Sequence, residues 1–380
     1  MRYYNLSIIL ITVLFIGCSE QKSKSLVDTM ENSSMLTPKY AKGFSISTYS
    51  AGFLVDVFNP WQGATDVNYR YAFVYPDSSF KPQSATEIIP LPVSRIVCLS
   101  TTHIAYIDLL DETSKIIGIS GAEYVSNGLV RERFTKSLVK DVGFEQTINF
   151  ELLLSLKPDV VFGYGVGAEA AGYLHKLKDL KIPVVFIGDY LEDSPLGKAE
   201  WLKVFGMILG KYDEADDLFN KMQQECNITK DLVSGVEYKP KIFINLPWND
   251  VWYFPGRDGY MAKLIDDAGG NYLLTELDGN QSYPFSVESA LVKGMDADIW
   301  INTGSYASLE DIRNSFPRLS SLPVSQNGKI FNNNRRSDSG GGNDFWESGV
   351  VNPHVVLKDL VKIFHPDSIE HQMVYYQQLK

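Results

Sequence analysis

Two segments of the chain, residues 149–165 and 285–304, share one order of features. Their sequences are NFELLLSLKPDVVFGYG and FSVESALVKGMDADIWINTG. Each has a glutamate at the start of a short predicted helix, a break at Lys-Pro or Lys-Gly, an aspartate, and a buried strand that ends in glycine. This repetition predicts two lobes of similar construction, each presenting one acidic residue, Glu151 or Glu288. Two matched acidic side chains indicate docking onto a partner more than they indicate catalysis.

The composition is that of a globular protein with more than one core. The 380 residues exceed an ordinary single domain and suffice for two. Hydrophobic residues make up 44% of the chain and charged residues 21%, which excludes a largely disordered protein. The net charge of −11 argues against a nucleic-acid partner, because neutralising phosphates requires clustered Lys and Arg.

The N-terminus is typical of an export signal that ends in a lipidated cysteine. Arg2 precedes an apolar run over 6–16 that is too short to span a bilayer comfortably. Gly17 and Cys18 follow, which resembles the lipobox of bacterial lipoproteins, where the thiol is diacylated and the preceding peptide is removed. We therefore predict a signal peptide over 1–17, lipidation of Cys18, and a lipid-anchored, extracytoplasmic place in the cell envelope, facing the periplasm in a Gram-negative cell. The alternative is an uncleaved membrane anchor with an incidental Cys18.

The mature chain divides by sequence pattern into a tether and four further parts. Residues 18–40 are polar and rich in Ser and Lys, and we predict a tether from the lipid to the body. Residues 41–90 alternate apolar and polar side chains, which predicts a few antiparallel strands beside the first lobe. Residues 195–238 are helical in pattern, and a helix that restarts at Asp213 and runs to about Val233 is long enough to bridge two lobes.

The remaining parts, 91–194 and 239–380, alternate short apolar strands with helices, which predicts mostly parallel sheets with helices on their faces. The fold class is therefore α/β, with two Rossmann-like lobes joined by a single long helix and an N-terminal strand-rich extension. The expected strands are 95–99, 116–119, 141–143, 160–162, 184–187, 241–245, 299–302 and 329–331. The expected helices of the lobes are 103–110, 150–156, 168–180, 261–268, 287–293, 309–315 and 355–364. Cys98 and Cys226 lie in unlike surroundings, so we expect two separate idle thiols.

Four motifs, in order, resemble the substrate-binding proteins of ABC importers for ferric siderophores, haem and cobalamin, the class III or helical-backbone family. They are PVSRIVCLSTTHIAYIDLLDETSKIIGISG, FELLLSLKPDVVFGYG, PGRDGYMAKLIDDAGGNYL and YPFSVESALVKGMDADIWI, within a similarity that covers about 93–364. The resemblance implies a ligand in the cleft between the lobes, small hinge motions, and a monomer that serves an ABC permease dimer with its ATPase subunits. It also implies that Glu151 and Glu288 form ion pairs with permease arginines. The segment 41–90 departs from the better-known members.

The loops that follow the predicted strands are rich in aromatic residues, which suit flat ligands such as porphyrins and corrins. Carboxyl ends of parallel strands line the cleft in such folds. Two arginines in a glycine-rich segment can bind a phosphate or carboxylate, or can simply be solvated. The candidate ligand-binding residues are Tyr124, Tyr164, Trp248, Trp252, Tyr253, Tyr283, Arg335, Arg336 and Trp346.

Two other classes of function are weighed against this one. A related class binds bare Zn or Mn through three histidines and a carboxylate, but this chain has no His-rich loop and only His103 follows a strand suitably. An α/β hydrolase is disfavoured because G-x-S-x-G, H-E-x-x-H and C-x-x-C are all absent. We expect no catalytic residue, resident metal or cofactor. The sequence predicts a binding protein that delivers an iron complex (ferric siderophore or haem) or cobalamin to an ABC permease.

Overall fold

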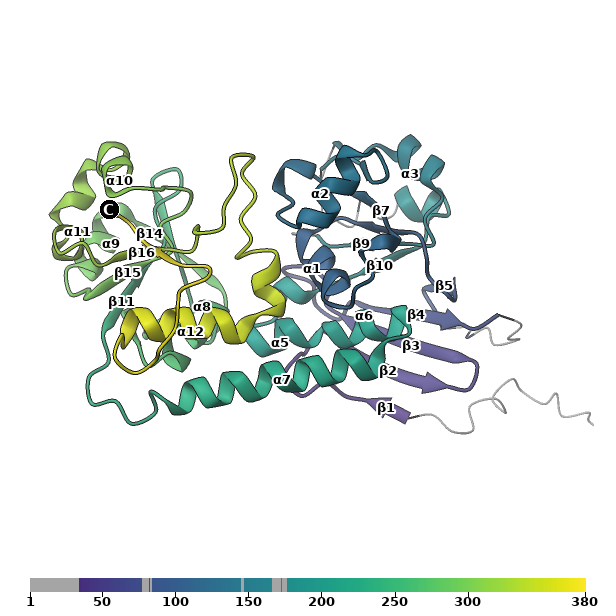
Figure 1. Ribbon diagram of the computed structural model, residues 1–380, viewed down its shortest axis with the longest axis horizontal. Helices are drawn as coiled ribbons and strands as arrows, with labels where there is room; N and C mark the ends of the chain where they lie inside the picture. The colour runs from purple at the N-terminus through teal and green to yellow at the C-terminus, as the bar shows by residue number, and fades with distance from the viewer. Residues whose placement is uncertain (1–33, 77–81, 83, 145–146, 166–171, 173–175) are drawn as a thin grey trace, which may run out of the picture.

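The computed structural model describes residues 34–76, 82, 84–144, 147–165, 172 and 176–380 (Figure 1). The predicted signal peptide, Cys18 and most of the predicted tether lie outside the described residues, as does much of the helix expected over 168–180. Two α/β lobes lie side by side above a layer of helices, and an N-terminal sheet lies beneath the first lobe (Figure 1). The predicted fold class is confirmed.

The N-terminal lobe is built on a parallel sheet of five strands in the order β10-β9-β6-β7-β8. The central strand β6 is wholly buried, as expected for a strand covered on both faces. The Ser100 hydroxyl accepts a hydrogen bond from the Thr102 N–H and caps the following helix. The elements are β6 (Ile96–Cys98), α1 (Thr101–Leu109), β7 (Ile116–Ile119), η3 (Ala122–Tyr124), α2 (Gly128–Thr135), β8 (Lys140–Asp141), α3 (Phe150–Leu156), β9 (Val160–Gly163) and β10 (Val184–Phe186).

The C-terminal lobe has a second five-stranded sheet in the order β13-β11-β15-β16-β17, parallel except for the edge strand β17. It also has an antiparallel pair, β12 with β14, that the sequence analysis missed. The elements are β11 (Lys241–Ile244), β12 (Val251–Pro255), α8 (Tyr260–Asp267), β13 (Asn271–Tyr272), β14 (Ser282–Ser286), α9 (Val287–Gly294), β15 (Ile299–Ile301), α10 (Leu309–Ser315), η6 (Pro317–Ser321), α11 (Pro323–Gln326), β16 (Ile330–Asn332), η7 (Ser348–Val351), α12 (Pro353–Phe364) and β17 (Gln377–Gln378).

A helical segment connects the lobes, and its longest member runs beneath both of them (Figure 1). It consists of α5 (Pro195–Glu200), α6 (Leu202–Leu209) and α7 (Tyr212–Asp231). Gly210 ends α6 in the left-handed conformation that favours glycine, so α7 restarts close to the predicted position. The C-terminal lobe is fastened to α7 by an ion pair of 2.6 Å between Lys358 Nζ on α12 and Glu225 Oε2.

The N-terminal extension forms a five-stranded sheet, which confirms the predicted strand-rich region. It packs on the edge of the first lobe, where the Tyr69 ring stacks on Phe186 of β10 at 5.2 Å, and on the helical segment, where the Phe44 ring meets that of Trp201 at 4.8 Å. The short strand β1 lies within the segment predicted as a tether. The strands are β1 (Ser34–Leu36), β2 (Phe44–Tyr49), β3 (Gly52–Phe58), β4 (Asn68–Val74) and β5 (Glu87–Pro90).

Two buried carboxylates, Glu192 just before α5 and Glu200 at the end of α5, hold the start of this extension. Glu200 accepts the peptide N–H groups of residues 39–41 at 2.7–2.9 Å. Glu192 accepts those of Lys42 and Gly43 at 2.9–3.0 Å. Because both carboxylates are buried and charge-assisted hydrogen bonds are strong, the extension is an integral part of the body rather than an appendage.

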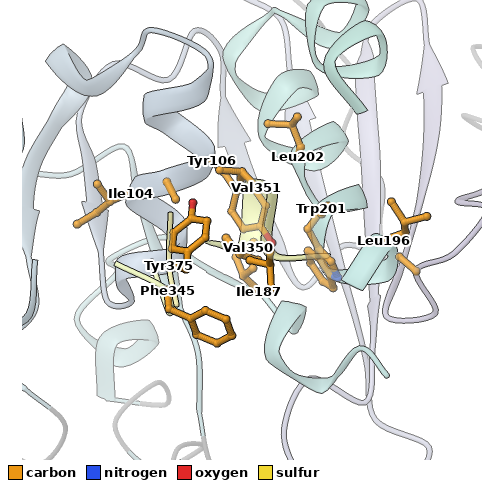
Figure 2. Close-up of a cluster of buried hydrophobic side chains, with 14 of the residues drawn as sticks. Ile104, Tyr106, Ile187, Leu196, Trp201, Leu202, Phe345, Val350, Val351 and Tyr375 are labelled. Carbon is orange, nitrogen blue, oxygen red and sulfur yellow. The ribbon is translucent and has the colours of Figure 1, made fainter. Parts of the chain in front are cut away.

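One hydrophobic cluster runs through both lobes and the connecting helices (Figure 2). Tyr106 of the N-terminal lobe, Trp201 of the helical segment, and Val350 and Val351 of η7 lie together in it. A shared core of this kind opposes wide separation of the lobes, because opening would expose apolar side chains to water.

Candidate functional site

A cavity of about 870 Å³ opens at the carboxyl ends of three parallel strands of the C-terminal lobe, β11, β15 and β16. Cavities of this size suit small-molecule ligands. Its walls come from the loops after these strands and from the long connection between β16 and η7. The lining residues are Asn245, Leu246, Pro247, Trp248, Asn249, Asp250, Met261, Asn302, Gly304, Ser305, Tyr306, Phe316, Asn333, Asn334, Ser337, Asp338, Gly341, Asn343 and Trp346.

Asparagines dominate the polar part of this lining, and three of them, Asn245, Asn249 and Asn302, have positive φ values. Asn245 and Asn302 follow β11 and β15 with positive φ values of 66° and 60°, which asparagine tolerates better than most residues. The Asn245 amide donates to the Tyr253 carbonyl at 2.9 Å, and the Asn302 oxygen accepts the Tyr376 hydroxyl at 2.8 Å. These amides therefore shape the floor of the cavity.

The aromatic residues of the lining include two that sequence analysis predicted. Trp248 and Trp346 line the cavity and remain 69% and 55% exposed, so each has a face free for a ligand. Tyr306 and Phe316 complete the aromatic lining. The only charged side chains among the lining residues are the acidic Asp250 and Asp338.

The prediction that Trp252 contacts the ligand is wrong. Its side chain is 0% exposed, packs at 4.9 Å from the Phe243 ring, and donates from Nε1 to the Ile244 carbonyl at 3.0 Å. The physical reason is strand alternation: on β12, Trp252 and Phe254 point into the core, and Tyr253 points to the other face.

Four further predicted residues do not line the cavity. Tyr253 is exposed on β12, and Tyr283 of β14 donates its hydroxyl to the Asp278 carbonyl at 2.8 Å. Arg335 is exposed, while Arg336 pairs with Asp344 at 2.8 Å and so already has a carboxylate partner within the protein. A ligand role for these four residues stays a prediction without support from the cavity.

The two tyrosines predicted in the N-terminal lobe lie at the carboxyl ends of its strands. Tyr124 is 44% exposed and faces Gly341 of the opposite lobe. Tyr164 directly follows β9 and is half-buried, with its ring 6.3 Å from that of Tyr190. Neither lines the described cavity.

Glu151 and Glu288 occupy equivalent places on α3 and α9. Each is exposed at the second residue of its helix. The N-cap side chain of each helix accepts a hydrogen bond from the first turn: the Leu152 N–H donates to Asn149, and the Ser289 N–H donates to Ser286. Glu288 also pairs with Arg318 at 2.7 Å, but both side chains are at least 70% exposed, so the pair contributes little. Both carboxylates are accessible to a partner.

The aspartate repeated in the two segments has a structural role that the sequence analysis did not assign. Asp159 accepts the Ser94 and Arg95 N–H groups at 2.8 and 2.9 Å, just before β6. Asp298 accepts the Lys241 N–H at 2.7 Å, at the start of β11. In each lobe this aspartate fastens the beginning of the first strand.

Other groups with potential chemistry are buried. His103 is fully buried, and desolvation lowers its pKa to about 3. Cys98 and Cys226 are buried free thiols, as expected, and burial raises the pKa of both. Within the described parts of the chain, no group of three or more His, Cys, Asp or Glu side chains is placed to hold a metal ion.

The sequence of this chain also matches that of a known protein family. Residues 96–334, more than half of the chain, match the model for "Periplasmic binding protein". The chain belongs to this family of periplasmic binding proteins. The resemblance to substrate-binding proteins of ABC importers is thereby confirmed. Proteins of this family are extracytoplasmic and work with ABC permeases and small-molecule ligands.

Individual proteins are similar to this chain in sequence or in fold. A protein named as an uncharacterized lipoprotein of Methanocaldococcus jannaschii is 24% identical, over 97% of this chain and 93% of its own. A periplasmic heme binding protein from Pseudomonas aeruginosa has a TM-score of 0.58 at 16% identity, covering 76% of this chain and 98% of its own. A possible iron-binding (periplasmic solute-binding) protein from Staphylococcus epidermidis has a TM-score of 0.55 at 19% identity, covering 72% and 99%. Among the helices the structure describes, none is long and apolar enough to cross a membrane.

Proposed function

We propose that this protein is a lipid-anchored, non-catalytic binding protein that captures a ferric siderophore, haem or cobalamin and delivers it, as a monomer, to an ABC permease dimer with its ATPase subunits. The observation that carries the proposal is the cavity of about 870 Å³ at the carboxyl ends of β11, β15 and β16, walled by Trp248 and Trp346. The printed names of the similar heme-binding and iron-binding proteins support this class of cargo. The name of the archaeal lipoprotein supports anchoring through Cys18.

The chemistry of the lining distinguishes two of the three candidate ligands, haem and cobalamin. None of the residues that line this cavity is Lys, Arg or His. Haem carries two propionate groups, and a carboxylate removed from water without a cationic partner costs free energy. Cobalamin presents carboxamides around its ring, which can exchange hydrogen bonds with asparagine amides while the ring packs on the tryptophans. The lining therefore favours cobalamin over haem.

Titration of the detergent-solubilised protein with cyanocobalamin, haem and a ferric siderophore, followed by tryptophan fluorescence, tests this ligand class. We expect quenching by at least one of them, with cyanocobalamin bound more tightly than haem. Replacing Trp248 and Trp346 together by alanine should weaken its binding by about 2 kcal/mol, about thirtyfold, because buried aromatic contacts dominate binding energies. Tyr238→Ala, an exposed aromatic outside the cavity, is the control. Tight binding of Zn²⁺, with no fluorescence change on adding cyanocobalamin, haem or the ferric siderophore, would contradict the proposal.

Docking to the permease is tested by replacing both Glu151 and Glu288 by alanine. Ligand uptake by cells should fall at least about tenfold, since two desolvated ion pairs to permease arginines are lost. Ligand affinity and stability should hardly change, because both side chains are exposed near helix starts, where a charge contributes a few tenths of a kcal/mol. Glu310→Ala, an exposed glutamate in the first turn of α10, is the matched control. Loss of ligand affinity in the double variant would instead place these residues in the binding site.

A further inference from the structure

The chain between β16 and η7 stands up between the two lobes (Figure 1). Its residues 337–347 are called the interlobe strap below. Asp338 shapes its tip, because its Oδ1 accepts the N–H groups of Gly340 and Gly342 at 2.9 and 3.0 Å, while its own N–H donates to the Gly342 carbonyl. The strap belongs to the C-terminal lobe in sequence but reaches the N-terminal lobe in space.

Three contacts seat the strap on the segment 122–131 of the N-terminal lobe. Arg131 of α2 pairs with the Asp338 carboxylate. The Ser126 N–H donates to Glu347 Oε2 at 2.7 Å, and Glu347 is buried. Between these two points the tip lies against the backbone of η3.

The glycines of the strap are required by this close approach. A Cβ atom added to Gly340 would lie 2.9 Å from the Glu123 carbonyl oxygen, and one added to Gly342 would lie 2.9 Å from that of Tyr124. Gly341 adopts a φ of +99°, which L side chains rarely do, and meets the Tyr124 ring. The glycine run therefore lets two backbones from different lobes lie in contact.

The same strap forms one wall of the ligand cavity. Ser337, Asp338, Gly341, Asn343 and Trp346 all line it. The strap thus faces the cavity with one set of groups and the N-terminal lobe with another. Any movement of the strap away from the N-terminal lobe displaces the wall that carries Trp346.

We propose that the interlobe strap is a latch that holds the ligand in the cleft, with Arg131 and Glu347 as positioning residues. This inference rests on the proposed function, since it assigns the retention of the ligand to a particular part of the same site. Because the Arg131–Asp338 pair is half-exposed, it contributes less than the buried hydrogen bond at Glu347 and the glycine contacts. The latch acts on ligand release, because the strap must leave the N-terminal lobe before the wall can open.

Two variants test the latch, with two measurements each. Gly342→Ala places a methyl group against the Tyr124 carbonyl, and Arg131→Ala removes the ion pair without adding bulk. Gly235→Ala is the control, since a Cβ there meets nothing within 4 Å. In the ligand-free protein, amide hydrogen exchange at Ser126 should become faster in both variants and stay unchanged in the control. In the loaded protein, release of cyanocobalamin should become about tenfold faster in Gly342→Ala and less so in Arg131→Ala.

The outcomes separate this inference from the proposed function. If the wild type binds cyanocobalamin and both variants release it at the wild-type rate, the latch is disproved and the binding function stands. If the wild type binds neither cyanocobalamin, haem nor a ferric siderophore, the proposed function fails and the latch fails with it. Faster exchange at Ser126 together with faster release supports the latch.

Discussion

Replacing Asp359 by alanine is expected to lower the free energy of unfolding by about 3–5 kcal/mol, the range for removing one partner of a buried charged network. Asp359 lies on α12 and is fully buried. Its carboxylate accepts the N–H groups of Val374, Tyr375 and Tyr376 at 2.6–3.1 Å and contacts His371 Nε2 at 2.6 Å. Alanine would leave three peptide N–H groups without their acceptor, and each unsatisfied buried group costs about 1–3 kcal/mol.

Replacing Asp359 should also affect the ligand cavity. The segment held by Asp359 continues into β17, which pairs with the edge of β16. It also carries Tyr376, whose hydroxyl donates to Asn302 on the cavity floor. Loosening this segment should therefore weaken ligand binding together with stability.

Urea unfolding followed by circular dichroism measures the effect. Asp367→Ala, an exposed aspartate just after α12, should change the unfolding free energy by less than about 0.5 kcal/mol. Asp359→Asn should lie between wild type and alanine, because the amide keeps one acceptor oxygen but loses the charge. An Asp359→Ala protein as stable as the Asp367→Ala control would show that the network has no net stabilising effect.

The alternation of strands and helices could be predicted because it depends on local pattern. Buried strands such as β6 and β9 are short apolar runs. Capping residues mark the neighbouring helices: Ser100 starts α1 after β6, and Asn149 starts α3 before β9. The β12–β14 pair was missed for a different reason. Its aromatic residues were interpreted as a ligand-binding loop, although the order V-W-Y-F-P from Val251 has the period of two that marks a half-buried strand.

Most of the candidate site could not be predicted, because its contacts join residues far apart in the chain. The Ser126–Glu347 hydrogen bond joins residues 221 positions apart in the chain, and no local sequence pattern predicts it. The glycine run 340–342 was a visible signal, but the sequence analysis treated it only as the surroundings of two arginines. Its physical cause, the backbone of the opposite lobe, appears only in three dimensions. Trp248 could be predicted because it follows a strand whose carboxyl end faces the cleft.

The attachment of the N-terminal extension also depends on contacts that local sequence pattern does not predict. Its strands follow from alternation, but its attachment depends on Glu192, just before the predicted helical segment, and on Glu200 within it, and the sequence analysis assigned neither carboxylate a role. Both carboxylates satisfy peptide N–H groups about 150 positions or more earlier in the chain. An extension that fastens the connecting helices in this way stabilises the arrangement of the two lobes.

The stability of the protein should fall as pH rises through the range in which Glu347 titrates. Burial raises the pKa of Glu347 from 4.5 to about 7, and the nearby carboxylates of Asp344 and Asp108 act in the same direction. The Ser126 and Asn127 N–H groups oppose this rise, and Arg336 partly offsets the charge of Asp344. The folded protein therefore holds a proton on Glu347 that the unfolded chain releases near pH 4.5.

Because the pKa of Glu347 is raised in the folded state, the stabilisation that comes from its bound proton is fully present below pH 4.5 and is lost by about pH 7. The loss is on the order of 3 kcal/mol, because each pKa unit corresponds to about 1.4 kcal/mol. Glu347→Gln isolates this effect from other titrating groups, since the amide is neutral at every pH and keeps an oxygen that can accept the Ser126 N–H. Unfolding free energies measured from pH 4 to 8 should show the wild type losing stability relative to Glu347→Gln across this window. Parallel profiles for the two proteins would mean that Glu347 titrates near its ordinary pKa, so that the contact between strap and N-terminal lobe is open to water.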